Sequence, residues 1–125
     1  MTLLELTVVI LVLLSLIGLL FAGSRAWKSG ADRTACIMHQ SNVQKALRGH
    51  ANLYGSYIGD TITDLPNQLV GYGRYVEATP TCPSGGAYTF GPEHGQDVVP
   101  PIGTIYMPCS LADSDDHEPP IYTDW

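Results

Sequence analysis

The sequence predicts an α+β fold, in which one long N-terminal α-helix packs on a small C-terminal antiparallel β-sheet. Three observations support this prediction. Residues 3–22 are almost entirely apolar, and residues 24–54 contain no proline and repeat apolar residues at helical spacing. The remainder is punctuated by Gly, Pro, Asn and Asp, which is typical of turn-rich β-structure. The 125 residues suffice for one domain, made of an apolar half-helix (1–23), an amphipathic half-helix (24–54) and a β-rich head (55–125).

The apolar segment 3–22 has the length of a membrane-spanning helix. Twenty residues at a rise of about 1.5 Å each give roughly 30 Å, which matches the hydrocarbon core of a bilayer. A cleaved signal peptide is disfavoured, because no basic residue precedes the apolar run. The basic residues Arg25, Lys28 and Arg33 follow it instead, and by the positive-inside tendency they favour a cytoplasmic head.

Glu5 is the single charged residue of this apolar segment. A carboxylate in such a helix costs several kcal/mol unless it is paired or protonated. One interpretation is a side chain near the membrane surface. The other is a partner at the same depth, the α-amino group of Met1 on the same chain or on a neighbour.

The segment 24–54 predicts an amphipathic continuation of the same helix, which we expect to end before Gly55. One face carries apolar or small residues, and the opposite face carries polar ones. The first face is formed by Cys36, Val43, Leu47, His50 and Tyr54, and the second by Arg33, Gln40, Gln44, Lys45 and Arg48.

Beyond Gly55 the sequence predicts one short helical turn and a few short strands. Residues 65–70 are expected to form the turn. Residues 87–90 and 104–107 are rich in β-formers and are expected to be strands, with 121–123 as a third.

Charge and motifs exclude several classes of function. The net charge is −6, and only six Lys and Arg residues are present, which argues against nucleic-acid binding by the chain's own charge. No Ser-His-Asp, phosphate-loop or zinc-protease spacing occurs, so we do not expect an enzyme.

The N-terminal run Met1–Ile10, MTLLELTVVI, resembles the mature N-terminus of type IV pilins and type II secretion pseudopilins. The resemblance covers roughly the first 25 residues. It implies cleavage by a prepilin peptidase, methylation of Met1, a glutamate at Glu5 that serves assembly, and a head outside the cytoplasm. One departure is Ala22, where many members carry a proline near which the helix loosens; Gly18 and Gly23 are the local substitutes.

The three cysteines leave two interpretations open. In an exported head, as the resemblance implies, Cys82 and Cys109 at the edges of predicted strands favour a disulfide, with Cys36 as a buried free thiol. The segment around Cys82 and the pair Ala35-Cys36 also resemble a subset of bacterial pilin-like proteins. The alternative is a zinc site built from the three cysteines and His117, which the absence of a Cys-x-x-Cys pair disfavours.

An acidic run near the C-terminus offers oxygen ligands. Asp113, Asp115 and Asp116 are candidates for calcium, which some pseudopilins bind in a C-terminal loop. The pattern of a calcium-binding loop is incomplete, so a solvated loop without a metal or other cofactor is the main expectation.

The resemblance implies a structural subunit of a type IV pilus-like filament, assembled by bundling of the N-terminal helices. Its partners would be identical subunits, the inner-membrane assembly machinery and the prepilin peptidase. The subunit would reside in the inner membrane before assembly and on the cell surface afterwards. The alternatives are a type II secretion pseudopilin and a single-pass anchored domain that does not polymerise.

Overall fold

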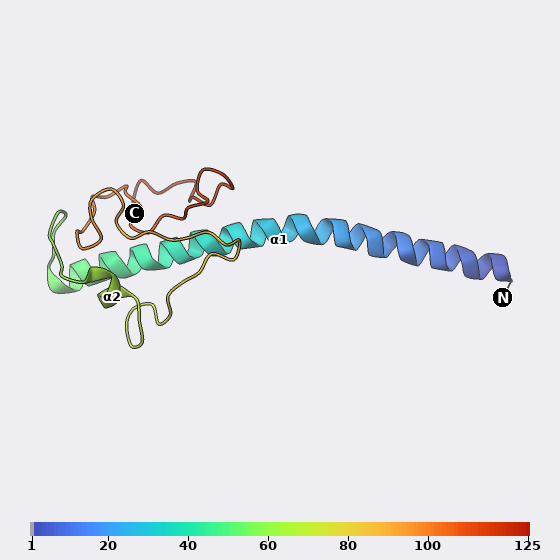
Figure 1. The fold of residues 1–125 in the computed structure, drawn as a ribbon, viewed down its shortest axis with the longest axis horizontal. Coiled ribbons are helices and arrows are strands. Elements are labelled where there is room, and N and C mark those ends of the chain that lie inside the picture. The colour runs from blue at the N-terminus through green and yellow to red at the C-terminus, as the bar shows by residue number, and fades with distance from the viewer. Residues whose placement is uncertain (1) are drawn as a thin grey trace. The chain divides into compact units, whose positions relative to one another are not determined.

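A computed structural model describes residues 2–125, and it contains two helices, α1 (Leu3–Tyr54) and α2 (Leu65–Leu69) (Figure 1). The chain divides into two compact units between Ala31 and Asp32, so helix α1 contributes to both. The predicted long N-terminal helix is therefore confirmed, and so is the short helical turn that begins at Leu65.

Helix α1 ends at the predicted glycine. Gly55 has a φ of 66°, in the left-handed region that glycine adopts without strain. The N–H of Ser56 donates to the carbonyl of Ala51 over 2.8 Å. This bond satisfies one of the carbonyls left open at the helix end and is the mark of a Schellman motif.

The second unit has one main core, built on the C-terminal part of α1. Figure 1 shows the rest of the chain as loops gathered along that part of the helix. Leu47 of α1 packs there with Leu65 and Leu69 of α2 and with Tyr106, and all four side chains are fully buried. The other buried members are Val43, Ala46, Val70 and Met107.

The predicted antiparallel sheet is wrong. Among residues 2–125 there is no sheet, and strand pairing is limited to three isolated bridges. One of them, the antiparallel bridge between Tyr88 and Cys109, lies beside the two predicted strands 87–90 and 104–107. The third predicted strand, 121–123, is irregular as well.

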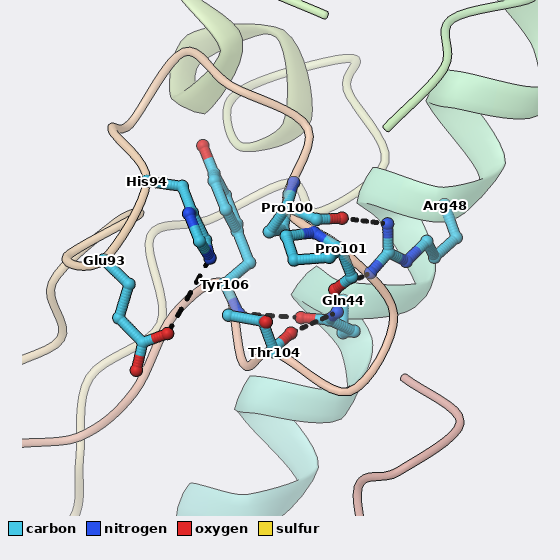
Figure 2. A network of polar contacts seen from close by, with 8 residues as sticks. All are labelled: Gln44, Arg48, Glu93, His94, Pro100, Pro101, Thr104 and Tyr106. Atoms are coloured by element: carbon cyan, nitrogen blue, oxygen red, sulfur yellow. Dashed lines mark hydrogen bonds and ion pairs between the residues drawn. The ribbon is translucent and has the colours of Figure 1, made fainter. Parts of the chain in front are cut away.

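Two missing donors explain why this pairing stays short. The segment 87–91 donates to 106–110, with Gly91 N–H bonded to Tyr106 O over 2.7 Å, and one bond returns, from Ser110 N–H to Ala87 O over 2.8 Å. Pro108 has no N–H to return a bond. The N–H of Tyr106 is directed instead to the Gln44 side chain of α1, over 2.9 Å (Figure 2). Side chains of the helix thus take the place of a neighbouring strand.

The polar face predicted for residues 24–54 is wrong at two positions. Gln40 and Gln44 are 1% and 3% exposed, because the amide of each side chain hydrogen-bonds to main-chain groups of the loops. Gln44 Nε2 also donates to Thr104 O over 3.0 Å, next to the bond from Tyr106 (Figure 2). Arg48, one turn further along α1, donates to the carbonyls of Pro100 and Pro101 over 2.8 and 3.1 Å.

Candidate functional site

The first candidate site is the apolar half of α1 in the first unit. Fifteen large apolar side chains between Leu3 and Phe21 are each 48–82% exposed, and no part of the most apolar stretch is buried. Helix α1 is long and apolar enough to cross a membrane. An apolar surface of this size in a folded chain marks a contact with lipid or with other protein.

Glu5 takes part in a capping box at the start of this helix. The N–H of Thr2 donates to Glu5 Oε2 over 3.1 Å, and the N–H of Glu5 donates to Thr2 Oγ1 over 3.3 Å. These reciprocal bonds satisfy two donors that the first helical turn leaves open. The sequence contains the pattern of a capping box, Thr-x-x-Glu before an apolar run. The interpretation of Glu5 from sequence rested on its charge and missed this role. Met1, the predicted methylation site and partner of Glu5, lies outside the described residues.

Helix α1 is continuous through Gly18 and Gly23, the two glycines named above as local substitutes for a proline at Ala22. A Cβ atom at either glycine would meet no other atom within 4 Å. Neither glycine is therefore required by packing within the chain.

The second candidate site is a cluster in the second unit, here called the Cys3His cluster. Its members come from α1 and from loops between residues 82 and 117, and all four side chains are buried. Their sulfur and nitrogen atoms lie within 4.8 Å of one another. The members are Cys36 of α1, Cys82, Cys109 and His117.

The predicted disulfide between Cys82 and Cys109 is not formed. All three cysteines are free, and Cys36, expected as a buried free thiol, is buried beside the other two. The pairing was expected at the edges of two strands of a sheet, and residues 2–125 form no such sheet. Cys82 Sγ lies 3.4 Å from His117 Nδ1.

Cys82 and Cys109 stand in different electrostatic surroundings. Burial raises the pKa of the Cys82 thiol. Hydrogen bonds from the N–H groups of Ser84 and Gly86 and from the two other thiols lower it by more, so the pKa lies below its ordinary value. Burial and the neighbouring cysteines raise the pKa of Cys109 to about 12, although the N–H of Leu111 acts in the opposite direction. Of these two thiols, Cys82 therefore loses its proton at the lower pH.

The turn after Cys82 is shaped for close packing against the cluster. Gly85 has a φ of 85°, and its N–H donates to Cys82 O over 3.0 Å. A Cβ atom on Gly86 would lie 2.6 Å from Cys109 Sγ, closer than such atoms approach in real proteins. Glycine at position 86 is thus what lets the Cys82 turn reach the Cys109 sulfur.

The acidic run does not form a ligand set. Asp113, Asp115 and Asp116 are exposed, and Asp116 instead pairs with Arg33 over 2.8 Å. Within residues 2–125, the Cys3His cluster is the group of histidine, cysteine and acidic side chains whose ligand atoms gather closely enough to hold a metal ion.

Comparisons of this chain with models of protein families, with curated proteins and with solved structures find no match.

Proposed function

We propose that this chain is the structural subunit of a type IV pilus-like helical filament, held in the inner membrane before assembly and displayed on the cell surface afterwards. The observation that carries the proposal is the exposed apolar half of α1. The resemblance of residues 1–10 to mature pilins supports the same proposal.

The apolar surface of α1 is costly to leave in contact with water. Fully burying one Leu, Ile, Val or Phe side chain stabilises a protein by about 1.5–3 kcal/mol. Fifteen such side chains, each 48–82% exposed, therefore require an apolar environment. A bilayer provides it for the single subunit, and the helices of neighbouring subunits replace the lipid in a bundle. A head-to-tail contact that does not close produces a filament.

Glu5 supplies axial register in this proposal. Its capping bond to Thr2 involves Oε2 and leaves the negative charge in place. The positive N-terminus of Met1 on a neighbouring subunit would pair with that charge in the growing filament. An unpaired carboxylate at this depth costs several kcal/mol, so the pairing favours one position of the incoming helix.

Three variants separate the charge of Glu5 from its capping role. In Glu5→Gln the side chain keeps the length that a capping box accepts and loses only the charge. Thr2→Ala removes the cap, at about 1 kcal/mol, and keeps the charge. Glu5→Ala removes both. The measurement is electron microscopy of material sheared from cells, together with the amount of subunit in the membrane.

The expected result is membrane-inserted subunit with few or no filaments for Glu5→Gln and Glu5→Ala, and near-normal filaments for Thr2→Ala. Normal filament number and length in Glu5→Gln would refute the recruiting role. If wild-type cells yield no fibres and loss of the protein impairs secretion, the chain is a pseudopilin. A wild-type chain that stays monomeric in the membrane is an anchored domain.

A further inference from the structure

We propose that the Cys3His cluster binds one zinc ion, and that this ion is a structural centre of the head. The proposal concerns the second unit alone and does not depend on filament formation.

The geometry fits a tetrahedral ion. With Zn–S distances of about 2.3 Å and Zn–N distances of about 2.0 Å, neighbouring ligand atoms lie about 3.5–3.8 Å apart. The Cys82 Sγ to His117 Nδ1 distance of 3.4 Å is close to that separation. All four ligand atoms lie within 4.8 Å of one another, so small side-chain movements bring them onto one ion.

The donor set selects the metal and its role. Three thiolates and one imidazole suit zinc and exclude hard cations such as calcium and magnesium, which prefer oxygen. Structural zinc sites have four protein ligands, whereas catalytic sites keep one position open for water or substrate. All four members of the cluster are buried, at 0–6% exposure, which corresponds to a closed site.

Residues around the cluster hydrogen-bond to its members or to their neighbours and so fix their orientation, as groups behind the ligands do in metal sites. Gln40 Nε2 donates to Cys36 Sγ over 3.4 Å and to the carbonyl of His117 over 2.9 Å. Arg33 bonds both the carbonyl and the carboxylate of Asp116, the residue before His117, over 2.7 and 2.8 Å.

A bound zinc ion would stabilise the fold of the head. The head has no sheet among its described residues, and its core is small for the length of loop that it must order. The cluster ties α1 to three loop segments at once. Because such a site does not exist in the unfolded chain, the free energy of metal binding becomes free energy of folding.

The test uses the full-length chain, purified in detergent under reducing conditions without chelator. We expect elemental analysis to find one zinc ion per chain and thiol counting of the denatured protein to find three free cysteines. Cobalt(II) added to the reduced, metal-stripped protein should produce the absorption bands of thiolate-bound tetrahedral cobalt. This titration uses the wild-type chain, so it remains informative if a variant fails to fold.

Matched variants locate the site. His117→Gln and Cys82→Ser should lose the zinc, whereas His94→Gln, a change at a histidine with an exposed side chain, should keep it. Gln40→Leu should weaken zinc binding about 10–100-fold without abolishing it, as expected for a positioning residue. A protein with no zinc and no cobalt bands, or with a disulfide between any two cysteines, would overturn the proposal. Full zinc content in both His117→Gln and Cys82→Ser would overturn it too.

Discussion

Replacing Gln44 by Met tests whether helix side chains hold the head together in place of a sheet. The Gln44 side chain is 3% exposed and makes two bonds to the loop beside it. It accepts from Tyr106 N–H over 2.9 Å and donates to Thr104 O over 3.0 Å (Figure 2). Methionine has a similar length and can make neither bond.

The expected loss follows from the two groups left without a partner. A buried polar group that loses its hydrogen bond costs about 1–3 kcal/mol. The Tyr106 N–H is buried and should lie in this range, whereas the bond to Thr104 is only partly buried and should lie at its lower end. We therefore expect Gln44→Met to lower the free energy of unfolding of the head by roughly 2–4 kcal/mol.

The assay is urea unfolding of the full chain in detergent, followed by near-UV circular dichroism, which reports the packing of the tyrosines in the head. The control is Asn42→Met, the same new side chain at an exposed position of α1 two residues away. That variant should change the unfolding free energy by less than about 0.5 kcal/mol. Equal stability of the two variants would contradict the role assigned to Gln44.

Three further changes are expected to alter stability in the same assay. Leu47→Ala, at a fully buried position, should destabilise the head by about 2–5 kcal/mol. Gly86→Ala brings a methyl group too close to Cys109 Sγ and should lower the free energy of unfolding by about 1–3 kcal/mol. Gly49→Ala, with open space around the new methyl group, should raise it by about 0.5–1 kcal/mol. Equal signs for the two glycine variants would contradict this packing. Burial raises the pKa of Tyr106, so above pH about 10 the unfolded chain loses the phenolic proton before the folded chain does. The free energy of unfolding should therefore be unaffected by this group below pH about 10 and should fall above it. Tyr106→Phe should make that alkaline loss less steep, and an unchanged slope would refute the assignment.

The parts that could be predicted from sequence depend on neighbours along the chain. Helix α1 follows from apolar periodicity and from the absence of proline up to Tyr54, and its end follows from Gly55 in the left-handed conformation. The capping box of Thr2 and Glu5 could be predicted from the sequence in the same way, because its two residues lie three positions apart.

The sheet failed as a prediction because strand pairing depends on partners across space. Residues 87–90 and 104–107 have the composition of strands, and composition does not show which N–H groups are available to a neighbour. Pro108 removes one such donor, and the Gln44 side chain takes up another. The burial of Gln40 and Gln44, placed on the polar face by periodicity, has the same origin.

The sequence by itself determined the long helix, its exposed apolar half and the types of ligand available, because these are properties of local pattern and composition. Only the tertiary structure decided that three cysteines and His117 meet at one point. Cys36 is separated from Cys82 by 45 residues without any spacing motif, so no short-range signal joins them. Their meeting depends on how the loops fold back along α1, where burial of Leu47 and Tyr106 and the bonds from Gln40 and Gln44 select one arrangement.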